Sequence, residues 1–155
     1  MLNIGLLEKE IENNSKLLNI LLADCKVAQQ AVQKVHWRLT GVHFQYLHEL
    51  TEKLYQHFDI VIDLLAERIR QLNQQPVATL AAVLQTTTLT EHSNLNDSTG
   101  YLDEINDNYN AIIKAIRTTI KHVQYSNDYA TSNLLETLIE QFEQKAWFIR
   151  NHLEQ

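Results

Sequence analysis

Two pairs of metal-ligating side chains lie along one stretch of this chain that has helical spacing. His48 and Glu52 are four residues apart, and so are Asp63 and Glu67. Residues four apart share one face of an α-helix, so each pair presents two ligands in the same direction. Eleven residues, about three turns, separate Glu52 from Asp63, which places both pairs along one side of the helix.

The length of this helix keeps the two pairs apart. At about 1.5 Å per residue, Glu52 and Asp63 are expected to lie roughly 16 Å from each other, whereas metal–oxygen bonds are about 2 Å long. One chain therefore cannot use both pairs on one ion. An antiparallel copy of the helix, crossing near residue 57 or 58, would bring His48 and Glu52 of one chain beside the second pair of the other. A two-fold interface would create two such sites, so any metal site is predicted to be shared between subunits.

His36 is a further candidate ligand on the preceding helix. It lies about five residues before Gly41, and His48 lies about seven residues after it, so two antiparallel helices would bring the imidazoles together. Two imidazoles with three carboxylates suit Fe(II), Mn(II) or Zn(II). Open coordination positions would admit water, oxygen or peroxide, and iron would permit redox chemistry.

Spacing alone leaves simpler interpretations open. Carboxylates four apart on a helix usually belong to a solvated face, and Asp63 and Glu67 could form ion pairs with Arg68 or Arg70. His36 could be an ordinary histidine at the edge of the core. Four more histidines lack an evident second ligand at i+4 and are interpreted as surface or boundary residues: His57, His92, His122 and His152.

Four long helices are expected to position these residues. Apolar residues recur every three or four positions in the stretches 7–39, 43–73, 102–123 and 135–153, without the alternation of a strand. Gly41 is expected to separate the first two helices, Pro76 to end the second, and Asn127 with Asp128 to separate the last two. A short helix is expected within residues 74–98. The prediction is an all-α, ferritin-like four-helix bundle with a long crossover, forming a single domain over residues 1–155.

The composition agrees with a helical protein and excludes several classes. The 155 residues include three glycines and one proline, far below the usual shares of roughly 7% and 5%, and β architectures depend on these residues for their turns. The glycines are too scattered for a P-loop or a Rossmann motif. A formal net charge of −6 argues against a large nucleic-acid footprint.

The cellular setting is expected to be the cytoplasm. Cys25 is the single cysteine, so neither an intramolecular disulfide nor a CxxC motif can form. The first residues do not combine a basic start with an apolar stretch, as a secretory signal would. No run approaches the roughly 20 apolar residues that cross a bilayer, so no membrane partner is expected.

The motifs around the candidate ligands resemble those of the Dps family, the mini-ferritins also called DNA-binding proteins from starved cells. The family pattern is H-W-x-x-x-G-x-x-F-x-x-x-H-E, then an acidic residue, then D-x-x-A-E-R. This chain matches it without a gap from His36-Trp37 through Gly41, Phe44, His48-Glu49 and Glu52 to Asp63 and Ala66-Glu67-Arg68. The run Ala146-Trp147-Phe148-Ile149-Arg150 resembles the closing helix of the family.

The resemblance implies a hollow dodecamer of four-helix subunits, built from two-fold dimers with ferroxidase centres at their interfaces. His36, His48 and Glu52 would come from one subunit, and Asp63 and Glu67 from its partner. Fe(II) would be oxidised there, preferentially by hydrogen peroxide rather than oxygen, and Fe(III) would be stored in the cavity. Consuming iron and peroxide together would protect the cell from oxidative damage.

Some positions depart from the family pattern or leave two roles open. Glu52 stands where aspartate is usual, and its extra methylene is expected to change iron affinity or oxidant preference. Arg38 stands where asparagine is common, and we have no functional interpretation of it. Trp37 would either intercept radicals beside the centre or pack at the interface. Asp128 would either line a three-fold pore, as acidic residues do in the family, or cap a turn.

DNA binding is expected to be weak or absent. Family members that bind DNA commonly use a lysine-rich terminal tail, which gains affinity by releasing counterions from the phosphates. Here Lys9 is the one lysine before residue 16, acidic residues surround it, and the chain ends on His152-Leu153-Glu154-Gln155.

The sequence leaves three other functions to consider. A nucleoid-associated protein that protects DNA by direct binding is the main alternative, and the termini disfavour it. An inert helical adaptor would leave the five candidate ligands unexplained. A di-iron site inside one bundle needs Glu-x-x-His motifs on two helices, and no glutamate here is followed three residues later by histidine.

Overall fold

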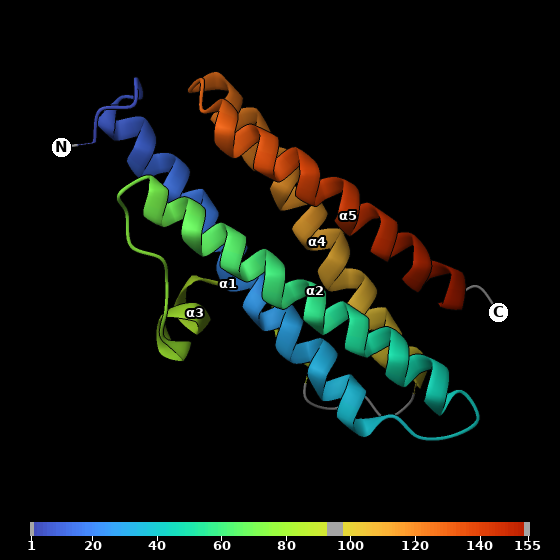
Figure 1. Ribbon diagram of the computed structural model, residues 1–155. Helices are drawn as coiled ribbons and strands as arrows, with labels where there is room; N and C mark the ends of the chain where they lie inside the picture. The colour runs from blue at the N-terminus through green and yellow to red at the C-terminus, as the bar shows by residue number, and fades with distance from the viewer. Residues whose placement is uncertain (1, 93–97, 154–155) are drawn as a thin grey trace.

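Helices account for the regular structure of the chain. The computed structural model describes residues 2–92 and 98–153, and within these ranges there is no strand. The elements are α1 (Glu8–Arg38), α2 (Phe44–Gln71), α3 (Leu80–Thr86), α4 (Ser98–Tyr125) and α5 (Tyr129–Leu153). The four long helices form a bundle, and short α3 lies outside it (Figure 1). The predicted all-α fold, with a short helix in the long connection between the second and third long helices, is confirmed.

The long connection sets the directions of the helices. α1 and α2 are antiparallel neighbours joined by a short turn, and so are α4 and α5. α2 and α4 both run from the lower end to the upper end of the bundle in Figure 1. A short turn would force neighbouring helices to be antiparallel, so the parallel arrangement of α2 and α4 requires the long crossover.

The end of α2 differs from the sequence-based prediction. Pro76 was expected to end this helix, but α2 already ends at Gln71. Asn73 adopts a φ of 58°, and the backbone N–H of Gln74 donates to the carbonyl of Ile69 at 3.1 Å. This is the hydrogen bond of a left-handed helix terminus, in which asparagine can replace glycine. The termination signal is therefore Asn73, and Pro76 lies in the connection beyond it.

The apolar stripes of the long helices meet in one core. At its centre Phe58, Tyr109 and Phe142 are fully buried, with ring centroids 5.3 to 5.7 Å apart. This cluster joins α2, α4 and α5 near the middle of the bundle. The tilted arrangement of the rings is one that aromatic pairs prefer. The apolar face of α2 is thereby held against a rigid interior, while Asp63 and Glu67 on the same helix stay exposed.

The connection that carries α3 is fastened to α1 by polar contacts. The buried carboxylate of Asp24 accepts hydrogen bonds from the hydroxyl of Thr87 at 2.7 Å and from the backbone and hydroxyl of Thr88 at 2.6 and 2.9 Å. Val83 of α3 packs against Ala23 and Val27 of α1. These contacts satisfy a buried charge and fix the crossover to the bundle.

Candidate metal centre

Two predicted ligands meet where α1 and α2 come together. His36 lies in the last turn of α1 and His48 near the start of α2. Their rings stack with centroids 3.7 Å apart and planes inclined by 20°. The sequence-based expectation that the chain reversal at Gly41 brings both imidazoles together is confirmed.

His36 is also held by hydrogen bonds to α2. Its Nδ1 atom lies 3.0 Å from the backbone oxygen of His48 and 3.0 Å from Thr51 Oγ1. His36 is 8% exposed and Thr51 is fully buried. This position agrees with an ordinary hydrogen-bonded histidine at the edge of the core and with a positioned ligand, so the ligand role of His36 stays a prediction.

Glu52 follows one turn after His48, and an aromatic residue contacts it. The hydroxyl of Tyr55 lies 3.5 Å from Glu52 Oε1, and its ring meets the ring of His36 edge to face at 5.3 Å. Desolvation and the negative charge of Glu52 raise the pKa of the Tyr55 phenol above its ordinary value. The phenol therefore stays protonated and can donate to the carboxylate.

Asp63 and Glu67 lie farther along α2 and are exposed. The simpler interpretation paired them with Arg68 or Arg70. Arg68 instead binds Asp128 at 2.8 Å, and Arg70 donates to the backbone oxygen of Gln74 at 2.8 Å. Neither acidic side chain forms an ion pair or hydrogen bond within residues 2–92 and 98–153.

One protomer does not assemble the full ligand set. The structure brings His36, His48 and Glu52 to one end of α2, and the helix carries Asp63 and Glu67 about three turns away. Across the described part of the chain, no group of three or more His, Cys, Asp or Glu side chains is placed to hold a metal ion. The placement of the five ligands around one ion remains a prediction about two chains.

Asp59 is a neighbour of the site that the sequence-based analysis missed. It lies four residues before Asp63 on the same face of α2, and its exposed carboxylate accepts a hydrogen bond from Gln29 Nε2 of α1. The same amide lies 3.4 Å from the backbone oxygen of Tyr55. Asp59 could have been identified from its i,i+4 spacing to Asp63, as the other carboxylates were. No spacing in the sequence identifies its partner Gln29.

Asp128 caps a helix and does not line a pore in this protomer. It is 2% exposed and accepts hydrogen bonds from the backbone N–H of Thr131 at 3.1 Å and from its hydroxyl at 2.6 Å. Asn14 Nδ2 donates to it at 3.0 Å, beside the ion pair with Arg68. The capping role at the start of α5 is confirmed, because buried carboxylates in this position stabilise free N–H groups.

His57 faces away from the candidate centre. It is partly buried between α2 and α5, where Nε2 lies 3.0 Å from Gln141 Oε1. Desolvation lowers the pKa of His57, the hydrogen bond to Gln141 opposes this shift, and the charge of Lys145 adds to it. The prediction that His57 is a boundary residue agrees with this position.

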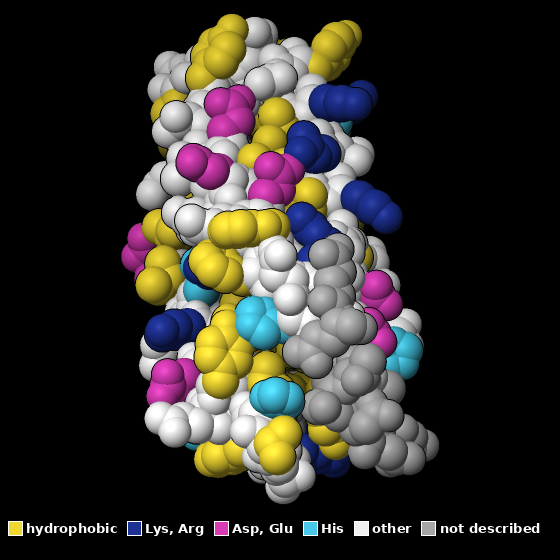
Figure 2. All heavy atoms as spheres, turned by 90° about the vertical axis from the view of Figure 1, so that its right-hand side faces the viewer, with side chains coloured by type: hydrophobic (Ala, Val, Ile, Leu, Met, Phe, Trp, Pro, Cys, Tyr) yellow, Lys and Arg dark blue, Asp and Glu magenta, His cyan; other side chains and the backbone are white. Residues whose placement is uncertain are grey.

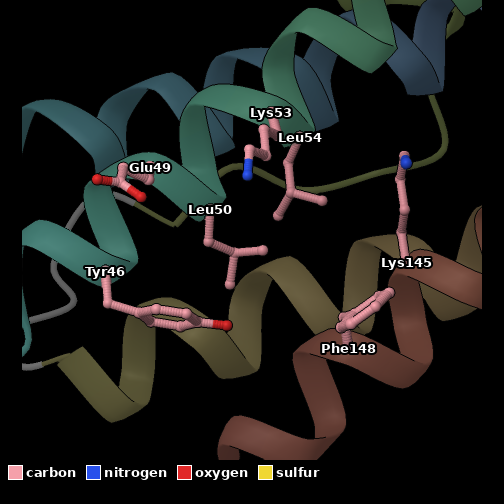
Figure 3. Close-up of a pocket in the computed structure, with 7 residues that line it drawn as sticks. All are labelled: Tyr46, Glu49, Leu50, Lys53, Leu54, Lys145 and Phe148. Atoms are coloured by element: carbon pink, nitrogen blue, oxygen red, sulfur yellow. The ribbon is translucent and has the colours of Figure 1, made fainter.

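A separate pocket opens between α2 and α5 (Figure 3). Its volume is about 230 Å³, and it is lined by Tyr46, Glu49, Leu50, Lys53, Leu54, Lys145 and Phe148. None of the five candidate ligands lines it. Two lysines make it an unsuitable site for a divalent cation.

Apolar side chains are exposed near the candidate centre. Val42, Trp37 and Phe44, around the α1–α2 turn, are 95%, 69% and 44% exposed, and Trp147 on α5 is 53% exposed. Figure 2 shows hydrophobic and histidine side chains gathered on the lower half of one face. Large exposed apolar areas commonly mark interaction surfaces.

No described helix is long and apolar enough to cross a membrane.

Comparisons with known proteins agree with this architecture. The sequence matches the Ferritin family, described as a ferritin-like domain, over residues 15–155. It is 31% identical over 140 residues to the DNA protection during starvation protein 2 of Bacillus anthracis, covering 90% of this chain and 96% of that protein. The chain belongs to the Dps family of ferritin-like proteins.

Further relatives match this Dps-family protein along nearly its whole length. An uncharacterized low temperature-induced protein of Nostoc sp. is 32% identical over 158 residues, covering 99% of this chain and 87% of that protein. A Dps protein of Vibrio cholerae O1, described as a member of a broad superfamily of ferritin-like diiron-carboxylate proteins, has a TM-score of 0.95 and 26% identity, covering 99% and 97% of the two chains. Dps from Thermosynechococcus elongatus has a TM-score of 0.91 and 27% identity, covering 95% and 94%.

Proposed function

We propose that this Dps-family protein is a ferroxidase that oxidises Fe(II), preferentially with hydrogen peroxide, and stores Fe(III). The centre is formed by His36, His48 and Glu52 of one subunit with Asp63 and Glu67 of its two-fold partner. Six two-fold dimers assemble into a hollow dodecamer, and the iron is held in its cavity. The protein acts in the cytoplasm as a single ferritin-like domain over residues 1–155.

The stacked and hydrogen-bonded pair of His36 and His48 carries this proposal. Both imidazoles stand at one end of α2, next to a carboxylate, while Asp63 and Glu67 remain solvent-exposed and unpaired in the described chain. His36 is buried, whereas the carboxylates of Asp63 and Glu67 are free. This arrangement agrees with a site that a second copy of the chain completes. The description of the Vibrio cholerae relative as one of the ferritin-like diiron-carboxylate proteins supports iron as the metal.

The ligand set suits the oxidation of Fe(II). Carboxylates favour the harder Fe(III) product, while imidazoles bind both oxidation states, so the set lowers the free energy of Fe(III) relative to Fe(II). Hydrogen peroxide accepts two electrons, one from each of two Fe(II) ions, and takes up two protons to leave two water molecules. No hydroxyl radical is released when both electrons are delivered together.

A second candidate function is the protection of DNA by direct binding. The names of several relatives, such as the Bacillus anthracis protein, refer to DNA protection during starvation. The formal charge of −6 opposes phosphate binding by this chain. We therefore propose that any protection of DNA comes from the removal of iron and peroxide.

Complementation between two inactive variants tests the shared centre. His36→Ala and Asp63→Ala damage opposite halves of the site, and each protein alone is expected to lose the fast phase of Fe(II) oxidation after anaerobic loading and peroxide addition. When the two chains are co-expressed with different tags, half of the dimers formed by random pairing are mixed. Each mixed dimer has one intact centre, so about a quarter of the wild-type fast phase should return.

The controls separate assembly from chemistry. Asp107→Ala removes an exposed carboxylate of α4 and should leave the fast phase unchanged. Size exclusion should show particles of the same size for every variant. If purified mixed particles oxidise iron no faster than the single variants, the centre is not shared between subunits; unchanged kinetics in either single variant would reject the ligand assignment.

A further inference from the structure

The contacts of His36 determine which ring nitrogen carries the proton. Nδ1 lies 3.0 Å from the backbone oxygen of His48, and a carbonyl oxygen can only accept a hydrogen bond. Nδ1 must therefore donate, so it carries the proton. A neutral imidazole has one N–H group and one lone pair, which leaves the lone pair on Nε2.

The hydroxyl of Thr51 takes part as an acceptor. Its oxygen lies 3.0 Å from His36 Nδ1, and two backbone oxygens can accept its hydrogen, that of Leu47 at 2.7 Å and that of His48 at 3.1 Å. Because both of these carbonyls can only accept, the threonine hydrogen goes to one of them, and a lone pair of the threonine oxygen faces the imidazole N–H. Thr51 is completely buried, so water does not compete for this contact.

We propose that Thr51 is a positioning residue that, together with the carbonyl of His48, holds His36 as its Nδ1–H tautomer and reserves Nε2 for the metal. This inference rests on the proposed ferroxidase centre. Nε2 of His36 has no hydrogen-bond partner in the described part of the chain, which leaves it free to ligate. Partners behind a metal-binding histidine fix its tautomer and the direction of its ring.

The second imidazole lacks such support. Nδ1 of His48 is buried without a hydrogen-bond partner, and its ring is located by stacking on His36 and by Phe44, whose ring centroid is 5.0 Å away. Fixing His36 therefore also supports the ring of His48. The two imidazoles therefore differ: hydrogen bonds fix the ring of His36, whereas ring contacts alone locate that of His48.

Thr51 was not selected by the sequence-based analysis because threonine is not a metal ligand. Its position in the sequence could have indicated its role, because it lies three residues after His48 and directly before Glu52. A residue three positions after another lies beside it on the same helix face, so Thr51 points to the same neighbouring helix as His48. Here that neighbour is α1 and the side chain it meets is His36.

Replacing Thr51 by valine or serine separates the hydroxyl from the shape of the side chain. Thr51→Val keeps the branched shape and removes the acceptor, whereas Thr51→Ser keeps the hydroxyl. Losing a partner behind a metal-binding histidine typically lowers metal affinity about 10–100-fold. Because the His48 carbonyl remains, a loss of about 10-fold is expected for Thr51→Val and little loss for Thr51→Ser.

A matched control is available in α4. Thr119 is 3% exposed and donates to the backbone oxygen of Ala115, four residues earlier, at 2.9 Å. Thr119→Val thus removes the same kind of buried hydroxyl from a helix remote from the centre. It should change neither the tautomer of His36 nor metal affinity.

Two measurements test the inference. Solid-state NMR of the metal-free assembly with ¹⁵N-labelled histidine identifies the protonated nitrogen of His36, with the signal assigned by its loss in His36→Ala. Co(II), titrated by its visible absorption, gives the dissociation constant. We expect the Nδ1–H form in the wild type and in Thr51→Ser, a mixture with the Nε2–H form in Thr51→Val, and weaker Co(II) binding only in Thr51→Val.

The outcomes distinguish this inference from the proposed function. If His36→Ala weakens Co(II) binding but Thr51→Val changes neither tautomer nor affinity, the role of Thr51 is rejected and the centre stands. If His36→Ala leaves Co(II) binding unchanged, the centre itself is rejected. An Nε2–H form of His36 in the wild type would overturn the inference whatever the Thr51 variants show.

Discussion

The ring of His36 at the end of α1 stacks on the ring of His48 at the start of α2, with centroids 3.7 Å apart. The contact depends on a sharp reversal of the chain within residues 39–43. Gly41 makes that reversal with a φ of 95°, in a region that residues with a side chain rarely adopt. The geometry of the candidate centre is therefore linked to the backbone of one glycine.

Replacing Gly41 by alanine should destabilise the protein through the backbone alone. A Cβ at this position would meet no atom within 4 Å, so no steric clash contributes. Holding an alanine in the left-handed region is expected to cost about 1–2 kcal/mol of unfolding free energy, measured by urea denaturation. Gly41→Asn should lose less, because asparagine tolerates this conformation. Equal stability of the alanine and asparagine variants would show that the turn can relax to another conformation.

Local spacing predicted the helices and the meeting of the two imidazoles. Apolar periodicity reflects which face of each helix is buried, and the nearly equal distances of His36 and His48 from Gly41 reflect the antiparallel pairing of two helices. The end of α2 was predicted at Pro76 because proline is the stronger breaker in general. Asn73 ends the helix earlier, since its left-handed conformation satisfies the carbonyl of Ile69.

Long-range contacts could not be predicted from spacing. The partners of Asp128 are Asn14 and Arg68, which lie 114 and 60 residues away, so no local motif identified its burial. The contact of Thr51 with His36 likewise depends on how α1 and α2 are rotated against each other. The pairing of Asp63 and Glu67 with ligands of a second chain stays a prediction, since it depends on an interface between subunits.

Removing the carboxylate of Asp128 should strongly destabilise the fold. Asp128→Ala leaves the guanidinium of Arg68 without its carboxylate partner and removes the cap of α5. Loss of one member of a buried ion pair typically costs about 3–5 kcal/mol. Urea denaturation of the variant measures the loss. As a control, Glu143→Ala breaks the exposed pair with Arg117, where both side chains are about half exposed, and should cost less than about 1 kcal/mol. Similar losses in both variants would contradict the structural role of Asp128.

The burial of His57 should make stability depend on pH. Because desolvation lowers its folded-state pKa, the unfolded chain binds more protons below the ordinary histidine pKa of about 6.5. The free energy of unfolding should therefore fall as the pH drops through about 6.5 toward the lower folded-state pKa.

His57→Gln removes this titration and keeps an amide that can bond to Gln141. The loss of stability between neutral and mildly acidic pH, followed by urea denaturation, should be smaller in His57→Gln than in the wild type. His122→Gln replaces an exposed histidine of α4 and should retain the wild-type pH dependence. If the stability of His57→Gln depended on pH as strongly as that of the wild type, groups other than His57 would cause the dependence.

The thiol of Cys25 should be unreactive in the native protein. Cys25 is 1% exposed, and desolvation together with the charge of Asp24 raises its pKa far above the ordinary value. The thiolate is the reactive species, so its population in the fold is negligible. Ellman's reagent should detect almost no thiol under native conditions and one per chain after denaturation. As a control, Gln144→Cys in a Cys25→Ala background provides an exposed thiol, which should react rapidly. Equal reaction rates for the two thiols would contradict the burial of Cys25.

DNA binding should be weak or absent at physiological salt. Affinity for a duplex comes mainly from neutralising phosphates and releasing counterions, and each chain carries a formal charge of −6. Figure 2 shows Lys and Arg side chains gathered beside Asp and Glu side chains on the upper half of one face. A mobility-shift assay with nonspecific duplex, without free metal, should leave the DNA unshifted. Fusing a lysine-rich segment to the N-terminus should create a salt-sensitive shift and so establish that the assay detects binding. A shift with the unmodified protein would show that a local basic surface outweighs its net charge.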